Sequence, residues 1–202
     1  MYTVRPPFFL KLFYPRLIWR KSNKEKILYL TFDDGPIPEI TPFILDTLKE
    51  FDVKGTFFCV GENVTKHPEI FKRCLDEGHS VGNHTFNHLN GFKTSNEDYL
   101  VNIQRCQELL PGNLFRPPYG RIKPSQVKRL AGTHQIIMWD VLSGDFDVHI
   151  SREKCLNNVI RYTRNGSIIV FHDNIKAIPR VKYALPRTIE YFLKQGYQFD
   201  VL

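Results

Sequence analysis

From residue 27 onward, short apolar runs alternate along the chain with longer stretches whose apolar residues recur at helical spacing. The runs predict seven strands, at 27–32, 55–60, 79–83, 114–117, 134–139, 167–171 and 197–202. The stretches between them predict six helices, five beginning near Thr41, Pro68, Ser95, Pro124 and Ser151 and a sixth that starts at or is bent by Pro186. This alternation indicates an α/β domain with parallel strands. An open doubly wound sheet and a closed or incomplete barrel both fit the order.

Two helix starts carry further signals. Thr41 and Pro42 supply an N-cap and a first helical residue. Thr94 and Glu97 stand at the spacing of a capping box for the helix that follows. The sequence therefore predicts where these two helices begin as well as that they exist.

Residues 1–26 differ from the rest of the chain in their mixture of aromatic and basic side chains. Lys11, Pro15 and Arg16 interrupt the apolar run and no small-residue cleavage site follows, so the pattern is not that of a cleavable signal peptide or a membrane span. We expect a strap packed on a single domain of residues 27–202, with peripheral contact to a membrane surface as the alternative. No transmembrane helix is predicted, which favours a cytoplasmic or membrane-associated protein.

Composition and charge narrow the classes of partner. The 202 residues, 42% hydrophobic and 24% charged, suit one globular domain. A formal charge of +7 favours an acidic partner such as an anionic cell-wall polymer, a membrane surface or nucleic acid. Nucleic acid is poorly supported because the basic residues are dispersed and no recognised reading motif appears. The 4 cysteines lack CxxC spacing, which favours buried free thiols over disulfides or a zinc cage.

Polar residues suited to chemistry follow most of the predicted strands. These residues are Asp33 and Asp34, His84 and His88, Arg116 and Tyr119, Asp145, and His172 with Asp173. Because the carboxyl ends of parallel strands converge on one rim, a single site could hold them all.

The acidic pair and the histidine pair together predict a metal site. "LTFDDGP" sets Asp33 beside Asp34 where a buried strand meets a turn, and like charges this close raise one pKa unless a cation lies beside them. "HTFNH" places His84 and His88 four residues apart, which puts both on the same side of a helical turn. Alone, this spacing is more often chance or packing. Two histidines with one carboxylate, however, are the ligand set of a hydrolytic zinc site or a similar divalent metal.

Two further motifs are less specific by themselves. In "RPPYG", Arg116 could hold a carboxylate bidentately, and an ordinary surface arginine is the plain alternative. In "VFHD", His172 ends an apolar run. It could be a third ligand, a general acid or a satisfied core histidine.

Taken in order, these motifs resemble those of the polysaccharide deacetylases with a NodB homology domain, carbohydrate esterase family four. "TFDDGP", "HTFNH" and "RPPYG" match the first three motifs of that family, "WDVLSGDF" resembles the fourth less well, and "IIVFH" resembles the fifth. The likeness runs from about residue 27 to residue 201, essentially the whole domain. It implies a single-domain, distorted and incomplete (β/α)7 barrel, which decides between the two architectures left open above.

The resemblance also implies a role for each candidate residue. By similarity Asp34, His84 and His88 bind a divalent metal, most readily zinc, with cobalt, nickel or manganese as alternatives. Asp33 is implied as general base, Arg116 as its partner, the backbone N–H of Tyr119 as oxyanion donor, and His172 as general acid oriented by Asp145. The implied substrate pocket includes Pro117, Pro118, Phe146, Ile168 and Val170.

The chain departs from the family pattern in the fourth motif. Leu142 stands where the family often has an acid, and Phe146 replaces a Trp, so the pocket loses an indole N–H. Asp145, the acid implied to orient His172, is present. The departures bear on the shape and polarity of the acetyl or sugar site, not on the acid and the base.

The implied activity is metal-dependent hydrolysis of N-acetyl groups from N-acetylglucosamine in peptidoglycan, a chitin-like glycan or poly-N-acetylglucosamine. An O-acetyl xylan esterase or a small-molecule C–N hydrolase of the same superfamily is the alternative within enzymes. A non-catalytic, basic protein that binds glycan or membrane is the alternative outside them. We expect a monomer whose partner is an N-acetylated glycan.

Overall fold

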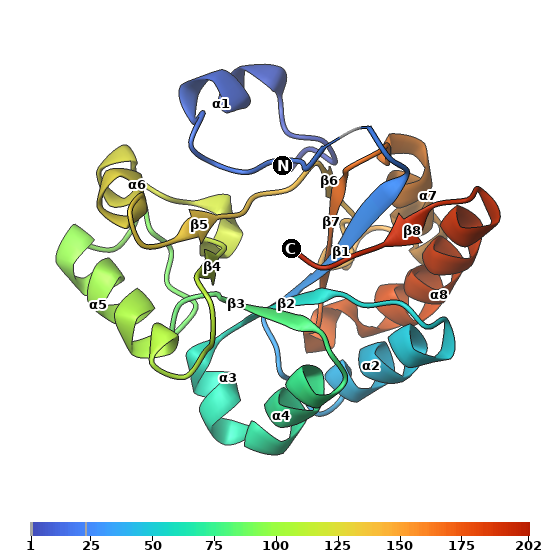
Figure 1. Ribbon diagram of the computed structural model, residues 1–202, viewed down its shortest axis with the longest axis horizontal. Helices are drawn as coiled ribbons and strands as arrows, with labels where there is room; N and C mark the ends of the chain where they lie inside the picture. The colour runs from blue at the N-terminus through green and yellow to red at the C-terminus, as the bar shows by residue number, and fades with distance from the viewer. Residues whose placement is uncertain (1, 23) are drawn as a thin grey trace.

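A curled parallel sheet forms the centre of the molecule (Figure 1). The computed structural model describes residues 2–22 and 24–202. The strands are β1 (Ile27–Asp33), β2 (Thr56–Cys59), β3 (Ser80–Asn83), β4 (Leu114–Phe115), β5 (Gln135–Ile136), β6 (Val141–Leu142), β7 (Ile168–His172) and β8 (Gln198–Phe199). They are ordered β5-β4-β3-β2-β1-β7-β6, and β8 pairs with the start of β1. Within the described residues β5 and β6 are the unpaired ends of this order, so the barrel is incomplete, as expected.

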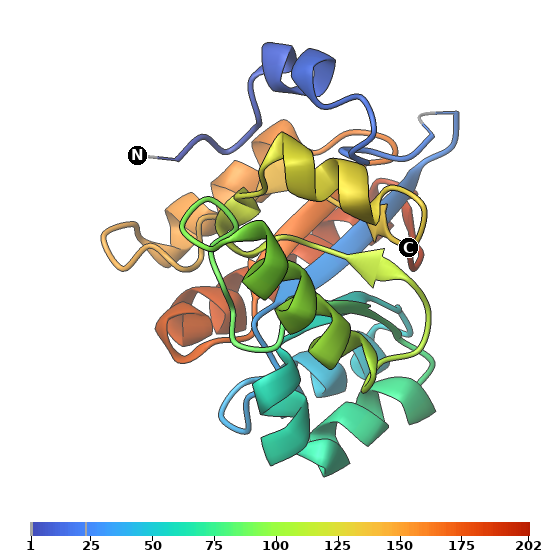
Figure 2. The same cartoon turned by 90° about the vertical axis from the view of Figure 1, so that its left-hand side faces the viewer.

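Helices cover the outer face of the sheet (Figures 1 and 2). The α-helices are α1 (Phe8–Phe13), α2 (Thr41–Glu50), α3 (Gly61–Lys66), α4 (Pro68–Asp76), α5 (Asn96–Gln107), α6 (Pro124–Leu130), α7 (Arg152–Tyr162) and α8 (Ile178–Lys194). Two 3-10 turns, Pro118–Gly120 and Ile175–Ala177, follow β4 and β7. Both turns lie on the rim where the strands end.

The central strand β1 separates the two sides of the sheet by its alternation. Its even-numbered residues 28, 30 and 32 pack in the main hydrophobic core with residues of α2 and α8. Tyr29 belongs to another buried cluster, and Thr31 bonds to the interior residue Arg116. Since successive side chains point to opposite faces, Asp33 lies on the same inner side as Tyr29 and Thr31. The strand therefore delivers its last residue to the inside of the barrel.

The N-terminal strap bridges the open side of the barrel. Ile18 donates its N–H to the Ile136 carbonyl at 2.9 Å and accepts from Met138 N–H at 2.7 Å, next to β5. Lys21 N–H bonds to the Gly166 carbonyl at 2.9 Å, just before β7. Leu17 and Trp19 are buried in a second hydrophobic cluster. In Figure 2, α1 projects from the body of the molecule beyond these anchors.

Several local predictions need correction. The side chain of Ser95, not Thr94, caps α5, accepting from Asp98 N–H at 3.0 Å. Thr41 is the first residue of α2 instead of its cap. The last helix begins at Ile178, and Pro186 lies inside it. Three elements were not predicted, namely α1, α3 and the two-residue strand β6, because all three are too short to show a period.

The thiol prediction is confirmed. The cysteines at 59, 74, 106 and 155 are all buried and free. Burial raises the pKa of the Cys74 and Cys106 thiols to about 12, so these two are inert packing residues.

Candidate active site

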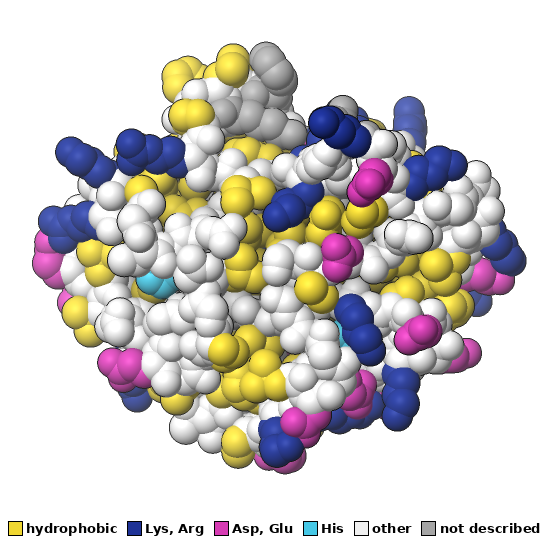
Figure 3. All heavy atoms as spheres, viewed as in Figure 1, with side chains coloured by type: hydrophobic (Ala, Val, Ile, Leu, Met, Phe, Trp, Pro, Cys, Tyr) yellow, Lys and Arg dark blue, Asp and Glu magenta, His cyan; other side chains and the backbone are white. Residues whose placement is uncertain are grey.

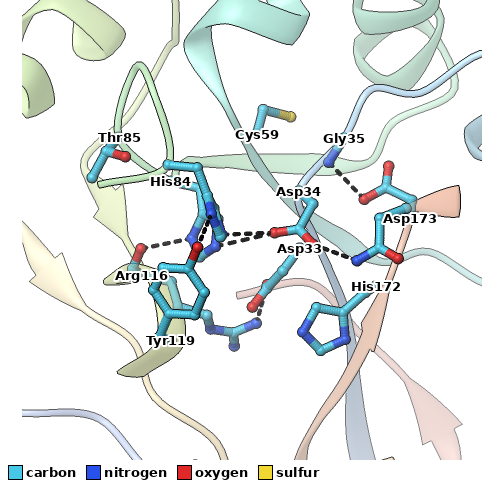
Figure 4. Close-up of polar contacts among 12 residues, drawn as sticks. Asp33, Asp34, Gly35, Cys59, His84, Thr85, Arg116, Tyr119, His172 and Asp173 are labelled. Carbon is cyan, nitrogen blue, oxygen red and sulfur yellow. Dashed lines mark hydrogen bonds and ion pairs between the residues drawn. The ribbon is translucent and has the colours of Figure 1, made fainter. Parts of the chain in front are cut away.

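The two adjacent acids at the end of β1 reach one rim by different means. Asp33 points inward as the last residue of the strand and is level with His172 of the neighbouring β7. Asp34 has a φ of 93°, outside strand geometry, which turns the chain at that residue. Figure 4 shows both acids on the same rim, with His84 on one side of them and His172 on the other.

A buried carboxylate holds the turn that follows these acids. Asp173 accepts from Gly35 N–H at 2.8 Å and from the Thr41 hydroxyl at 2.6 Å, and that hydroxyl also accepts from Ile37 N–H at 2.7 Å. A Cβ on Gly35 would lie 1.7 Å from the Asp173 carboxylate, so only glycine fits there. Burial raises the pKa of Asp173 to about 8. Sequence reasoning gave neither Asp173 nor Thr41 this role.

Asp34, His84 and His88 form a three-ligand cluster. Asp34 Oδ1 lies 3.6 Å from His84 Nε2 and 3.0 Å from His88 Nε2, and one ligand atom from each residue lies within 4.8 Å of the others. The helical turn expected for these histidines is wrong. Residues 84–88 form a loop, in which Thr85 and His88 have φ values of 62° and 55°. Left-handed turns, not helical spacing, bring the two rings together.

The protonation state of this cluster suits a cation. His84 Nδ1 lies 2.7 Å from the Arg116 carbonyl, so it carries the proton and leaves the Nε2 lone pair directed at Asp34. Burial lowers the pKa of His84 to about 4, which keeps the ring neutral. Burial alone would raise the pKa of Asp34, but the neighbouring imidazoles, His88 first, lower it well below its ordinary value. Two imidazole nitrogens and a carboxylate oxygen fit a divalent metal of the zinc type.

Asp33 is paired with a fully buried arginine. Arg116 Nη1 donates to Asp33 Oδ1 and to Thr31 Oγ1, both at 2.7 Å, and Nη2 donates to the Met138 carbonyl at 3.0 Å. The guanidinium carbon lies 4.1 Å from the centre of the Phe58 ring. These contacts fix the orientation of the Arg116 guanidinium. They leave Asp33 Oδ2 without a hydrogen bond to Arg116.

His172 is paired with a second buried acid. Asp145 Oδ1 lies 2.7 Å from His172 Nδ1, and Asp145 Oδ2 accepts the His172 backbone N–H at 2.6 Å. Burial would lower the pKa of His172, but the charge and hydrogen bond of Asp145, with smaller effects of Asp34 and Asp33, raise it to about 10. The ring can thus hold a proton at neutral pH with Nε2 available for its transfer.

Tyr119 contributes more than the backbone group expected of it. Its φ of 60° places it in a left-handed turn, and its hydroxyl lies 3.1 Å from His88 Nδ1. The phenol thereby orients a ligand residue from outside the cluster.

A cavity of about 830 Å³ brings most of the expected residues together. Asp33, Asp34, His84, His88, Tyr119 and His172 line it, as do the pocket candidates Pro117, Phe146 and Val170. Two pocket candidates do not line it. Ile168, at the start of β7, is fully buried in a cluster with Tyr29, and Pro118 is buried in the 3-10 turn after β4. Sequence reasoning missed the lining residues Tyr2, Trp139 and Asn174. Trp139 opens the fourth motif but was given no role, and the other two lie outside the motifs.

Asn174 adds a polar contact on the far side of the ligand cluster. Its amide donates to Asp34 Oδ2 at 2.6 Å, so one carboxylate oxygen of Asp34 faces the histidines and the other is held by this amide. Position 174 directly follows Asp173, which is the only sequence signal that could have indicated it.

An incomplete parallel barrel whose carboxyl rim carries an Asp-His-His cluster that could hold a metal, an arginine-paired carboxylate and an acid-paired imidazole fits the class of metal-dependent hydrolases. The family model for polysaccharide deacetylase matches residues 20–135 of this chain. The chain belongs to the polysaccharide deacetylase family, which is metal-dependent. The family and fold class expected from the sequence are thereby confirmed.

Similar proteins extend this assignment over the whole domain. A peptidoglycan-N-acetylglucosamine deacetylase of Bacillus cereus is 35% identical over 189 residues, covering 90% of this chain and 88% of the relative. The peptidoglycan-N-acetylmuramic acid deacetylase PdaA of Bacillus subtilis is 34% identical over 194 residues, 88% of this chain and 70% of that protein. The crystal structure of the Bc1960 peptidoglycan N-acetylglucosamine deacetylase superposes with a TM-score of 0.90 at 34% identity, covering 98% of this chain and 95% of that one.

Proposed function

We propose that this chain hydrolyses the N-acetyl group of N-acetylglucosamine in peptidoglycan or a related glycan, releasing acetate and a free amine. One observation carries the proposal. The ligand cluster, a carboxylate held by Arg116 and an imidazole held by Asp145 all open into the same cavity. The relatives named above supply the substrate class, since the names of two of them include N-acetylglucosamine and that of PdaA includes N-acetylmuramic acid.

Each residue has a task in amide hydrolysis. Asp33 accepts a proton from the water that attacks the acetyl carbonyl, and Arg116 holds the carboxylate in the orientation this requires. The backbone N–H of Tyr119 donates to the carbonyl oxygen as negative charge develops there. His172 donates its proton to the leaving nitrogen, because an amine anion is too basic to leave unprotonated. Water thus adds to the carbonyl carbon and the C–N bond breaks. The attacking water gives one proton to Asp33, and the leaving nitrogen gains one proton from His172.

The metal is proposed to be zinc, with Asp34, His84 and His88 as its protein ligands. Two neutral imidazoles and a carboxylate suit zinc better than magnesium or calcium, which prefer oxygen ligands. When bound there, a divalent ion acts as a Lewis acid toward the acetyl carbonyl.

The direct test is acetate release from a panel of glycans by protein loaded with zinc. The panel contains peptidoglycan, chitooligosaccharides, acetylated xylan and 4-nitrophenyl acetate. We expect turnover of the first two, with a new free amine on glucosamine, and of the activated ester 4-nitrophenyl acetate, and loss of turnover in Asp33→Asn. If acetylated xylan were the only glycan turned over, the protein would be an O-acetyl esterase instead of an N-deacetylase. Glycan binding without turnover of any substrate would make the chain a binding protein.

We further propose that the strap contacts an anionic membrane surface. Residues 1–26 contain seven Lys and Arg and one Glu, a formal charge of +6, whereas the whole chain carries +7. In α1 of the same segment, Phe9, Leu12 and Phe13 are 54%, 66% and 76% exposed. Figure 3 shows basic side chains on both sides of the projecting apolar end. An exposed apolar helix beside clustered cations suits an anionic bilayer surface.

Vesicle sedimentation tests this contact. We expect binding to phosphatidylglycerol vesicles, weakened by salt, and none to phosphatidylcholine vesicles. A triple Ser variant at Phe9, Leu12 and Phe13 should lose it, whereas Val101→Ser, at a residue 68% exposed on α5, should not. Equal binding by both variants would refute the contact. No helix among the described residues has the length and apolar character needed to cross a bilayer, so any attachment through them is peripheral.

A further inference from the structure

The N-terminal strap places an aromatic side chain inside the active-site cavity. Tyr2 lines the cavity, and its ring centre lies 4.9 Å from that of Phe146. Phe146 in turn stands edge-on to His172 at 5.1 Å. Three rings therefore form one continuous wall that leads from the strap to the residue proposed as general acid.

Tyr2 is held there by specific contacts. Val4, two residues on, accepts the Leu142 backbone N–H at 2.8 Å, which joins the strap to the free edge of β6. The Arg5 guanidinium donates to the Tyr162 carbonyl and lies 4.0 Å from the buried Asp140 carboxylate. These anchors fix the backbone on the C-terminal side of Tyr2.

The cavity is also shaped to accept the phenol. A Cβ on Gly144 would lie 2.5 Å from the Tyr2 hydroxyl oxygen, and Gly144 has a φ of 81°, so a glycine is needed for both reasons. The Asp147 side chain lies near this hydroxyl. Burial, followed by the effect of Asp147, raises the pKa of Tyr2 to about 12, so the hydroxyl remains a neutral donor.

We propose that Tyr2 is a specificity-determining residue for the glycan, its ring covering a face of the sugar in the cavity. A pyranose presents C–H groups on its faces and hydroxyls at its edges. Phe146 and Leu142 offer this wall only apolar surface, and Tyr2 adds an amphipathic ring with a fixed polar end. This inference rests on the proposed function, because it assigns the sugar contact of that same cavity.

The experiment compares Tyr2→Ala and Tyr2→Phe with Tyr14→Ala, on zinc-loaded protein with its tag at the C-terminus. Tyr14 lies in the same strap but packs in the second hydrophobic cluster and is absent from the cavity lining. We expect Tyr2→Ala to raise the KM for chitotetraose about tenfold, the effect of one well-packed aromatic contact, with kcat little changed. Tyr2→Phe should show a smaller rise. Tyr14→Ala should leave the KM unchanged.

A small substrate separates sugar recognition from general damage. 4-Nitrophenyl acetate has no sugar, so Tyr2→Ala should hydrolyse it at the wild-type rate. Equal losses on both substrates, or an unchanged KM for chitotetraose, would overturn the proposal.

Failure of the proposed function gives a different result. If the wild-type protein turns over no glycan, saturation-transfer NMR with chitotetraose still measures binding. Weaker binding by Tyr2→Ala than by Tyr14→Ala would then support the sugar wall without catalysis. Equal binding by both variants, or no binding by the wild-type protein, would overturn it.

Discussion

Replacing Asp145 by Asn tests the acid assigned to leaving-group departure. Asp145 is fully buried and makes two bonds to His172, at 2.6 and 2.7 Å. The pKa of His172, raised to about 10, exceeds the ordinary 6.5 despite burial, and Asp145 is the main cause of the rise. In the Asn variant the burial stays and the charge is lost, so the pKa of His172 falls below 6.5.

The size of the effect follows from this shift. If the pKa falls to about 5, roughly one molecule in a hundred keeps the proton at pH 7, and kcat falls about 100-fold. Because a general acid works only when protonated, the kcat of the variant should rise as the pH is lowered from 7 toward 5. The wild-type protein should show no such rise there. The assay is kcat for acetate release across this range, with zinc held constant.

Asp140 provides the matched control for loss of a buried acid. It is also fully buried, and it accepts from Arg164 and Ser167 at 2.9–3.0 Å, away from His172. Asp140→Asn should lower the free energy of unfolding by about 1–3 kcal/mol and leave the pH profile unchanged. The reasoning fails if Asp145→Asn keeps the wild-type profile, or if Asp140→Asn shifts it equally.

Three further predictions concern the ion pair, acid stability and the metal. Arg116→Met leaves Asp33 buried and unpaired, so urea denaturation should show a loss of about 3–5 kcal/mol that adding Asp33→Asn partly restores; no recovery would argue against the pair. Burial, then Lys54, lowers the pKa of His79 to about 4, so only the unfolded chain takes up a proton between pH 6.5 and 4. His79 should therefore contribute about 3 kcal/mol to the fall in the free energy of unfolding over this range, and His79→Gln should remove that part while the part due to His84 remains; an equally steep fall in the variant would contradict it. Asp34→Asn should leave substoichiometric zinc by elemental analysis after dialysis, and a full complement would remove Asp34 from the ligand set.

The sequence predicted those parts of the site that depend on strand ends. β1 and β7 are long apolar runs in a fixed parallel register, so Asp33 and His172 had to meet at one level of the rim. Residue types then indicated candidate metal ligands, because two histidines and an acid have few other reasons to converge. The choice between an open sheet and a barrel was predicted from family resemblance alone. Strand order is set by long-range pairing, which no local period in the sequence encodes.

The parts that sequence reasoning missed depend on backbone turns and distant segments. Thr85, His88 and Tyr119 all adopt positive φ values, which β-branched and bulky residues rarely do, so spacing suggested a helical turn where there is a loop. Tyr2 lies 144 positions before Phe146 in the sequence, and only the pairing of Val4 with Leu142 brings the two rings together. Contacts of this kind are decided by the folded barrel and leave no mark in either segment alone.

The cost of placing two acids side by side is reduced because two of the acids at or beside the cavity are paired with cations. Asp33 is paired with Arg116, and Asp145 is paired with His172. Burial of Asp173 favours its uncharged form, and the low pKa of His84 keeps that ring neutral. Among these acids Asp34 faces histidines instead of a Lys or Arg, and a divalent ion held with His84 and His88 would offset its charge. Held there, such an ion would supply positive charge to the acetyl oxygen as negative charge develops on it, so the arrangement that stabilises adjacent carboxylates in the resting protein would also favour the transition state over the neutral amide.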